Sequence, residues 1–334
     1  MQKLDVAVIG AGPAGLTAGI YLGRGKLKAV IFEKSFAGGQ MAVSELIENF
    51  PGFGEGISGL ELAEKMRSQA VKCGAEIIEE EIARLEKIGE KIGTATIYLS
   101  AKETEINGRC PYFLLTTAEG RQYQALAVII ASGARPKRLG VPGEDKFAGR
   151  GVSYCAACDA PLFKDKVVVV VGGGDTAVQE AIFLTKYCAK VYLVHRRDRV
   201  RAAGVLAERF NANKKIEPVW NSVVTEIIGE KKVAGVVVNS VGANGHSPLQ
   251  LPCDGVFIFA GIEPNSSVAK DIVKHNESGF IITDEDMKAS REGIFACGDV
   301  SKKTLQQVVV ATGEGAQAAV SAQRYVETLK GTAY

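Results

Sequence analysis

Residues 155–177 read CAACDAPLFKDKVVVVVGGGDTA, and this segment is the most informative about the fold. The five valines at 167–171 are apolar and β-branched, which predicts a buried strand. Gly172-Gly173-Gly174 follows directly, and a glycine-rich turn after an apolar strand is where the pyrophosphate of a dinucleotide binds. The stretch therefore predicts a Rossmann-like nucleotide-binding unit that begins at Val167.

Two cysteines lie just upstream of this unit. Cys155 and Cys158 are separated by two residues, so they can close a small ring and store two electrons. A thiol pair that leads into a nucleotide-binding strand suggests that electrons pass from a nicotinamide to a disulfide through a mediator. A merely structural pair is the alternative. A zinc site would need a second pair, and none is formed by the single cysteines, which read as small apolar residues: Cys73, Cys110, Cys188, Cys253 and Cys297.

A second nucleotide-binding pattern lies at the N-terminus. An apolar strand is predicted at 4–9, followed by the turn Gly10-Ala11-Gly12-Pro13-Ala14-Gly15 and a helical stretch at 16–22. A further strand at 29–32 ends in Glu33, near the spacing at which an acid binds a ribose hydroxyl. The strand, the turn, the helix and the acid together predict a complete dinucleotide fingerprint.

The unit that starts at Val167 differs from this one at the acidic position. Its second strand, predicted at 191–194, ends in His195-Arg196-Arg197, and Arg199 and Arg201 follow. Arginines can bind a ribose 2′-phosphate through charge-assisted hydrogen bonds, whereas an acid would repel it. The pattern therefore favours NADPH over NADH, with a solvated basic turn as the alternative.

The two predicted nucleotide sites thus carry opposite charges: the acidic one suits an uncharged ribose hydroxyl and the basic one a phosphorylated ribose. FAD and NADPH fit these two sites. Two more apolar strands support a flavin. One covers 127–134 and ends in small residues, and the other covers 293–300 and places Asp299 at its end. The Asp299 carboxylate could there accept hydrogen bonds from a ribityl chain.

Nearly the whole chain resembles the low-molecular-weight thioredoxin reductases of the bacterial and archaeal type. The CxxC-Asp motif just before the NADPH strand is the most specific match. In the larger glutathione-reductase type the redox cysteines lie near the N-terminus and a C-terminal histidine acts as acid/base. Here no cysteine precedes Cys73 and the last histidine is His275, which disfavours that type. The other matching segments are 10–15, 38–40, 48–52, 131–134, 172–177, 195–201 and 298–299.

The resemblance implies a role for each matching residue. Cys155, Cys158 and Asp159 are implied to be catalytic. The implied NADPH-binding residues are Gly172, Gly173, Gly174, Asp175, Thr176, His195, Arg196, Arg197 and Arg201. The implied FAD-binding residues are Gly10, Gly12, Pro13, Ala14, Gly15, Glu33, Lys34, Gly38, Gly39, Gln40, Asn49, Ile82, Ala131, Ser132, Gly133, Gly298, Asp299, Gln307 and Val308.

The resemblance also implies the reaction. NADPH reduces the flavin, and the flavin reduces the Cys155–Cys158 disulfide. Cys158 is the implied flavin-proximal sulfur, Cys155 the sulfur that attacks thioredoxin, and Asp159 an acid/base group. A turn-capping aspartate is the alternative for Asp159. A domain rotation in this family presents the dithiol and the nicotinamide to the flavin in turn. A homodimer is implied as well.

We therefore expect an α/β fold of two Rossmann-like, three-layer nucleotide-binding domains, with the NADPH domain inserted within the FAD domain. The FAD-binding domain is predicted at 1–137 and 262–334, and the NADPH-binding domain, which carries the CxxC, at 138–261. Glycine and proline at 140–143 and 261–265 are compatible with a hinge or with ordinary turns. A helix is expected at 313–329.

Composition indicates a soluble enzyme. The formal net charge is +2, charged residues make up 23%, and hydrophobic residues make up 46% of 334 residues, so nothing suggests nucleic acid binding. No apolar run approaches the roughly 18 residues of a membrane span. The N-terminus lacks a signal-peptide pattern, and a cytoplasmic location is the default.

Some positions depart from the family pattern. Ala160 stands where relatives have glycine, Gln306-Gln307-Val308 stands where many have Arg-Gln-Ala, and segment 90–110 is longer than usual. Other substrates stay open: another thioredoxin-like or glutaredoxin-like protein, or a small-molecule dithiol on an enzyme running toward oxygen. A non-catalytic nucleotide-sensing module is disfavoured because the CxxC-Asp motif and both fingerprints are intact.

Overall fold

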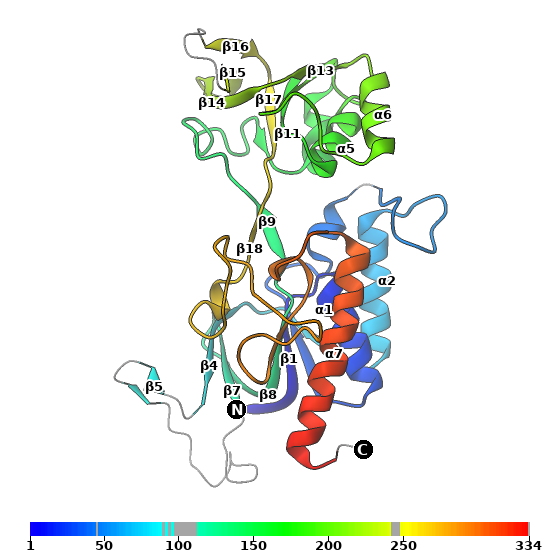
Figure 1. The fold of residues 1–334 in the computed structure, drawn as a ribbon, viewed down its shortest axis with the longest axis vertical. Helices are drawn as coiled ribbons and strands as arrows, with labels where there is room; N and C mark the ends of the chain where they lie inside the picture. Colours follow the sequence, from blue (N-terminus) through cyan, green and yellow to red (C-terminus); the bar gives the residue numbers. More distant parts are fainter. Residues whose placement is uncertain (45, 89–90, 93–94, 97–111, 242–247, 333–334) are drawn as a thin grey trace. The chain divides into compact units, whose positions relative to one another are not determined.

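The computed structural model describes residues 1–334 except 45, 89–90, 93–94, 97–111, 242–247 and 333–334. The chain forms two compact units (Figure 1). Unit 1 comprises Met1–Arg135 and Glu263–Tyr334, and unit 2 comprises Pro136–Ile262. The long segment 90–110 lies largely outside the described residues, which show only a short antiparallel pair there, β5 (Lys91–Ile92) and β6 (Ala95–Thr96).

Unit 1 is built on one seven-stranded sheet in the order β3-β2-β1-β8-β7-β4, with β19 paired to β8. Strands β1, β2, β3, β8 and β19 run parallel, and β7 and β4 continue the sheet antiparallel. The bounds are β1 (Gln2–Ile9), β2 (Ala29–Phe32), β3 (Glu76–Ile78), β4 (Ile82–Lys87), β7 (Phe113–Thr117), β8 (Gln122–Ile130) and β19 (Ile294–Ala296).

Three helices cover one face of this sheet. Figure 1 shows α1 (Pro13–Arg24), α2 (Gly59–Lys72) and α7 (Val308–Lys330) side by side. Because strand side chains alternate between faces, Val6 and Val8 pack into the helical layer. Ala7 and Ile9 pack into a second core with β4 and β7. Short 3₁₀ turns complete the unit: η1 (Gly39–Val43), η3 (Ser267–Ala269) and η4 (Gly298–Val300).

Unit 2 repeats this plan on a five-stranded parallel sheet in the order β10-β17-β11-β12-β13. Val168 and Val170 face the helical side, and Val169 and Val171 face the antiparallel sheet β14-β15-β16. The strands are β10 (Val152–Ser153), β11 (Val167–Gly172), β12 (Lys190–Val194), β13 (Ile216–Val219), β14 (Ser222–Gly229), β15 (Val233–Ser240), β16 (Leu249–Pro252) and β17 (Gly255–Phe259). The helices are α4 (Ala156–Asp159), η2 (Ala160–Phe163), α5 (Asp175–Leu184) and α6 (Gly204–Ala212).

The chain passes between the units twice, and the two passages pair with each other as β9 (Ala134–Pro136) and β18 (Ile262–Pro264). On one side, the Asn265 side-chain amide donates to the Ser132 carbonyl (3.0 Å), and the Ser132 hydroxyl donates to the Asn265 carbonyl (2.6 Å). These reciprocal bonds fix the base of both passages on unit 1.

The predicted α/β class is confirmed, and so are the main elements. The strands expected at 29–32 and 191–194 and the helices expected at 16–22 and 313–329 are all present. Two strands end earlier than expected. Strand β8 ends at Ile130, before the left-handed Gly133 (φ 67°), and β19 ends at Ala296, before the left-handed Gly298 (φ 71°). In the described part of the chain, no helix is long and apolar enough to cross a membrane.

Candidate active site

Cys155 and Cys158 form a disulfide in unit 2, with an S–S distance of 2.06 Å and a Cα–Cα distance of 5.4 Å. Cys155 follows β10 and Cys158 lies within the single turn of α4, so both cysteines precede the nucleotide-binding strand β11. Cys155 caps α4, because its Sγ accepts the N–H of Cys158 at 3.2 Å. Cys158 is exposed and Cys155 is half-buried, so the disulfide is open to a reductant or a substrate.

The two residues before Cys155 hold it in place. The buried Ser153 hydroxyl accepts the N–H of Cys155 and donates to its carbonyl, each at 3.1 Å. Tyr154 donates its hydroxyl to the buried Glu144 carboxylate. Burial, together with this hydrogen bond, raises the pKa of Tyr154 well above its ordinary value. The phenol therefore stays protonated as a donor.

Glu144 is a site residue that sequence reasoning missed. Its carboxylate also accepts the N–H groups of Leu139 (3.1 Å) and Gly140 (2.7 Å). One buried carboxylate thus ties the segment after the first passage to the residue beside the redox cysteine. The sequence indicated a turn at Pro142-Gly143, directly before Glu144. It gave no sign of which groups the Glu144 carboxylate would bind.

Asp159 ends α4 next to the disulfide. Its N–H donates to the Cys155 carbonyl at 3.3 Å. Among the described residues, its carboxylate accepts no hydrogen bond that would mark it as a cap. Ala160, which follows, is fully buried. The Asp159 carboxylate is therefore not engaged as a cap of the turn that follows.

The glycine turn of unit 1 leaves room for a phosphate at one position only. A Cβ on Gly10 would lie 2.4 Å from the Ala131 carbonyl oxygen, and one on Gly15 would lie 1.8 Å from the Gly10 carbonyl oxygen. A Cβ on Gly12 would meet nothing within 4 Å. The outer glycines therefore allow close packing of strand and helix, and the middle one faces open space at the start of α1.

Glu33 reaches this turn from the end of β2. Its Oε2 accepts the N–H of Ala11 at 2.8 Å, and its Oε1 accepts the N–H of Ser35 at 3.2 Å. A carboxylate has about four acceptor positions, so both oxygens can still accept further hydrogen bonds. Glu33 thus orients the turn and can still bind a ribose hydroxyl.

Some of the other predicted FAD residues contact this turn or one another. The Gly38 N–H donates to the Ala11 carbonyl at 2.8 Å, which brings segment 38–40 beside Gly12. The Asn49 side-chain amide donates to Gln307 at 2.8 Å, joining two predicted residues that are 258 positions apart. Lys34 is exposed and Ile82 lies at the start of β4; among the described residues, neither makes a side-chain hydrogen bond to the others.

Asp299 lies on the turn after β19, and its Oδ1 is buried without a hydrogen-bond partner among the described residues. Burial raises the pKa of this carboxyl; Lys303 lowers it and Glu314 raises it further. A buried carboxylate oxygen without a donor is costly, and a ligand hydroxyl would supply one. Asp299 therefore fits a role in holding a polyhydroxylated group.

Two residues that the sequence did not reveal support this turn. Glu314 of α7 accepts the Gly298 N–H at 2.8 Å and forms an ion pair with Lys303. Both side chains of the pair are largely buried. They fix the backbone beside Asp299.

The glycine turn of unit 2 has the same design. A Cβ on Gly172 would lie 2.4 Å from the Phe259 carbonyl oxygen, and one on Gly173 would lie 2.5 Å from the His195 ring. A Cβ on Gly174 would meet nothing within 4 Å, and α5 begins directly after it. Backbone N–H groups at the start of this helix can therefore face a phosphate. Thr176 lies exposed in the same first turn.

The basic residues after β12 border this turn. Arg196, Arg197 and Arg201 are exposed, and within the described ranges none has an ion-pair partner. Burial and the three neighbouring guanidinium groups lower the pKa of His195, which packs against Gly173. The site is thus strongly cationic without a protonated histidine.

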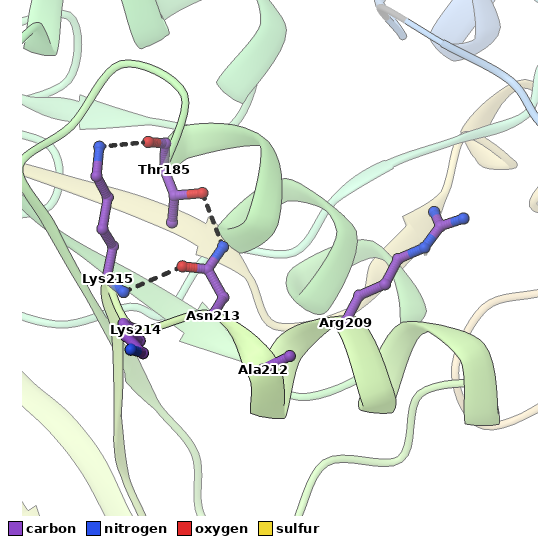
Figure 2. Close-up of a pocket in the computed structure, with 6 residues that line it drawn as sticks. All are labelled: Thr185, Arg209, Ala212, Asn213, Lys214 and Lys215. Atoms are coloured by element: carbon purple, nitrogen blue, oxygen red, sulfur yellow. Dashed lines mark hydrogen bonds between the residues drawn. The ribbon is translucent and has the colours of Figure 1, made fainter.

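A separate hollow at the end of α5 does not belong to the site. Figure 2 shows Thr185, Asn213 and Lys215 bonded to one another there. The Lys215 ammonium donates to the carbonyl of Thr185 (2.8 Å), the residue that caps the end of α5, and to the carbonyl of Cys188 (3.1 Å) in the segment after it. These polar groups stabilise the helix end, and their hydrogen bonds to one another leave few of them to bind a ligand.

The other cysteines lie apart from this chemistry. Cys188, Cys253 and Cys297 are buried free thiols, and Cys73 is half-buried. Burial raises the pKa of Cys188 to about 11 and those of Cys253 and Cys297 to about 12. They therefore stay protonated and unreactive. Cys110 lies outside the described residues.

Comparison with known proteins gives one consistent result. The family model for pyridine nucleotide-disulphide oxidoreductases matches residues 4–315. The chain is 42% identical to the thioredoxin reductase of Listeria monocytogenes, over 98% of this chain and 95% of that protein. It is 43% identical to the thioredoxin reductase of Bacillus subtilis, over 98% and 96%. The crystal structure of Lactococcus lactis thioredoxin reductase matches with a TM-score of 0.88 at 36% identity, covering 97% of this chain and 99% of that one.

Proposed function

The chain belongs to the pyridine nucleotide-disulphide oxidoreductases and, within them, to the low-molecular-weight thioredoxin reductases, and from this membership we propose how its residues carry out the reaction. By homology it is an NADPH-dependent flavoenzyme that reduces the disulfide of thioredoxin. The observation that carries the proposal is the Cys155–Cys158 disulfide, placed directly before the nucleotide-binding strand of unit 2.

We infer that unit 1 binds FAD. The residues fit: Gly12 opens toward a phosphate, Glu33 can accept a ribose hydroxyl, and the orphaned Asp299 oxygen can accept a ribityl hydroxyl. The predicted residues that contact one another across the chain, such as Asn49 and Gln307, support the same site. When bound, the flavin supplies two-electron transfer between a nicotinamide and a disulfide.

We infer that unit 2 binds NADPH on the turn formed by Gly172, Gly173 and Gly174. Uncompensated guanidinium groups beside a helix start suit a nucleotide with both a pyrophosphate and a 2′-phosphate. We therefore assign FAD to unit 1 and NADPH to unit 2, which correspond to the domains expected from the sequence at 1–137 with 262–334 and at 138–261.

The chain's own steps are thiol–disulfide exchange. In the reduced enzyme the Cys155 thiolate attacks the partner's disulfide, forms a mixed disulfide and releases one partner thiolate. Cys158 then attacks Cys155, the enzyme disulfide re-forms, and the second partner thiol leaves. Asp159 can donate a proton to a departing thiolate and recover it later. Ser153 and Tyr154 hold Cys155 in position through this exchange.

The test of this function is direct. We expect about one non-covalent FAD per chain, released on denaturation, and NADPH oxidation that depends on oxidised thioredoxin and yields two thiols per NADPH. Glutaredoxin-like proteins, small disulfides and oxygen are assayed in parallel as alternative acceptors. A folded, active protein without flavin contradicts the proposal, as does turnover only with an acceptor other than a thioredoxin-like protein. We also expect a homodimer, which light scattering measures.

Asp299→Asn should weaken FAD binding about tenfold, because a neutral acceptor forms a weaker hydrogen bond than a carboxylate. The same change should not destabilise the apoprotein. Burial raises the pKa of Asp299, so the wild-type apoprotein loses stability as the pH rises above the ordinary value of 3.8 toward the raised pKa. The Asp299→Asn apoprotein should not show this pH-dependent loss of stability.

Flavin fluorescence titration measures the first effect, and unfolding of the apoprotein at a series of pH values measures the second. Asp271→Asn, at an exposed carboxylate of the same unit, is the control and should change neither. Unchanged FAD affinity, or an apoprotein destabilised equally at every pH, would contradict the role given to Asp299.

A further inference from the structure

The segment between β12 and α6 is tied to the glycine turn of unit 2. We call residues 196–203 the arginine loop. The Arg201 N–H donates to the Gly173 carbonyl at 2.6 Å. The Ala203 N–H donates to Oδ1 of Asp175 at 2.7 Å. Asp175 is the first residue of α5, and Ala203 is the residue before α6, so one carboxylate joins the starts of two helices.

The loop is also held at its other end. The Asn221 N–H donates to the Arg197 carbonyl at 3.1 Å, and the Ser222 N–H donates to the His195 carbonyl at 2.9 Å. Val200 and Ala202 pack against the core between α5 and the sheet. The backbone of the arginine loop is therefore fixed, while the guanidinium groups it carries stay exposed and unpaired with other described residues.

Asp175 sits poorly for a direct contact with the nucleotide. A carboxylate in the first turn of a helix repels a pyrophosphate at the same helix end. One of its oxygens already accepts a backbone N–H of the arginine loop. Both facts point to a role through the loop, in contrast to the direct cofactor contact expected from the sequence.

We propose that Asp175 is a specificity-determining positioning residue, whose carboxylate latches the arginine loop onto the glycine turn and so presents the guanidinium groups to a 2′-phosphate. This inference rests on the proposed function of unit 2. Without the latch, the start of α6 is released and the loop with Arg201 can move away from the turn. Binding of the 2′-phosphate then weakens, and binding of the rest of the nucleotide does not.

Two variants of the full-length protein test the latch. Asp175→Ala removes the acceptor, and Asp175→Asn keeps an acceptor oxygen without the charge. Calorimetry with adenosine 2′,5′-bisphosphate and with adenosine 5′-monophosphate reports the 2′-phosphate contribution without any redox step. We expect Asp175→Ala to bind the bisphosphate about tenfold more weakly and the monophosphate within about twofold of wild type. Asp175→Asn should stay near wild type for both.

The kinetic counterpart is a selective rise in KM for NADPH, with KM for NADH unchanged. Gln179→Ala, at an exposed position of the same helix, controls for general effects on α5. Thermal unfolding confirms that each variant is folded. In a protein that already carries Arg196→Ser, Arg197→Ser and Arg201→Ser, adding Asp175→Ala should weaken bisphosphate binding less than about twofold further, because residues that act through one another are not additive.

Three results with the variants would overturn the latch. Equal weakening of both adenosine ligands by Asp175→Ala would assign Asp175 to the helix start. If Asp175→Asn bound the bisphosphate as weakly as Asp175→Ala does, the effect would come from the charge of Asp175 and not from the hydrogen bond. An unchanged preference for the bisphosphate in Asp175→Ala would remove the role altogether. A wild type with no preference for the bisphosphate would instead overturn the NADPH assignment, and the latch with it.

Discussion

Cys155→Ser and Cys158→Ser are each expected to lower thioredoxin reduction at least about a thousandfold, because exchange needs one sulfur to attack and a second to resolve. The two variants should differ in what they trap. Cys158→Ser keeps the attacking thiol and loses the resolving one, so it should accumulate a mixed disulfide between Cys155 and the partner. Cys155→Ser should form none.

Mass spectrometry of each reduced variant after incubation with oxidised partner separates these cases. Cys73→Ser provides the matched control, since Cys73 is a half-buried free thiol outside the disulfide, and it should turn over normally. Trapping through Cys158 in Cys155→Ser, with none through Cys155, would reverse the two roles. This matters because Cys158 is the more exposed of the two residues, and exposure alone does not assign the attacking thiol.

The architecture could be predicted because it depends on short-range patterns. The five valines before Gly172 form β11, and their alternate side chains fill two separate cores. Glu33 and the arginines after β12 occupy equivalent strand ends, so their opposite charges could be compared directly in the sequence. The exact strand ends were less predictable, because left-handed glycines at 133 and 298 end two strands early.

The supporting hydrogen bonds could not be predicted, because they join residues that are far apart in the sequence. Asp175 and Ala203 are 28 positions apart, and Asn49 and Gln307 are 258 apart. Glu144 and Glu314 carry no motif, and their importance comes from burial and from the backbone N–H groups they accept. Sequence patterns thus located the parts that we propose to contact ligands, and the structure identifies the residues that hold those parts.

Arg196→Ser combined with Arg197→Ser is expected to lower kcat/KM for NADPH about ten- to a hundredfold, because charge-assisted hydrogen bonds to the 2′-phosphate are lost. With NADH, which has a hydroxyl at that position, kcat/KM should change less than about threefold. The expected result is therefore a loss of cofactor preference, measured by steady-state kinetics with both nucleotides at fixed thioredoxin and fixed ionic strength.

A charge-matched variant decides whether contact or general attraction is responsible. Lys214→Ser combined with Lys232→Ser removes two exposed positive charges elsewhere on unit 2. If the arginines act by direct contact, this control keeps its NADPH preference, and the loss in the arginine variant persists at high salt, where long-range attraction is screened. Equal losses with NADPH and NADH, or a control as impaired as the arginine variant, would show that the basic residues only attract anions. The 2′-phosphate assignment, which depends on unpaired guanidinium groups beside Gly173, would then fail.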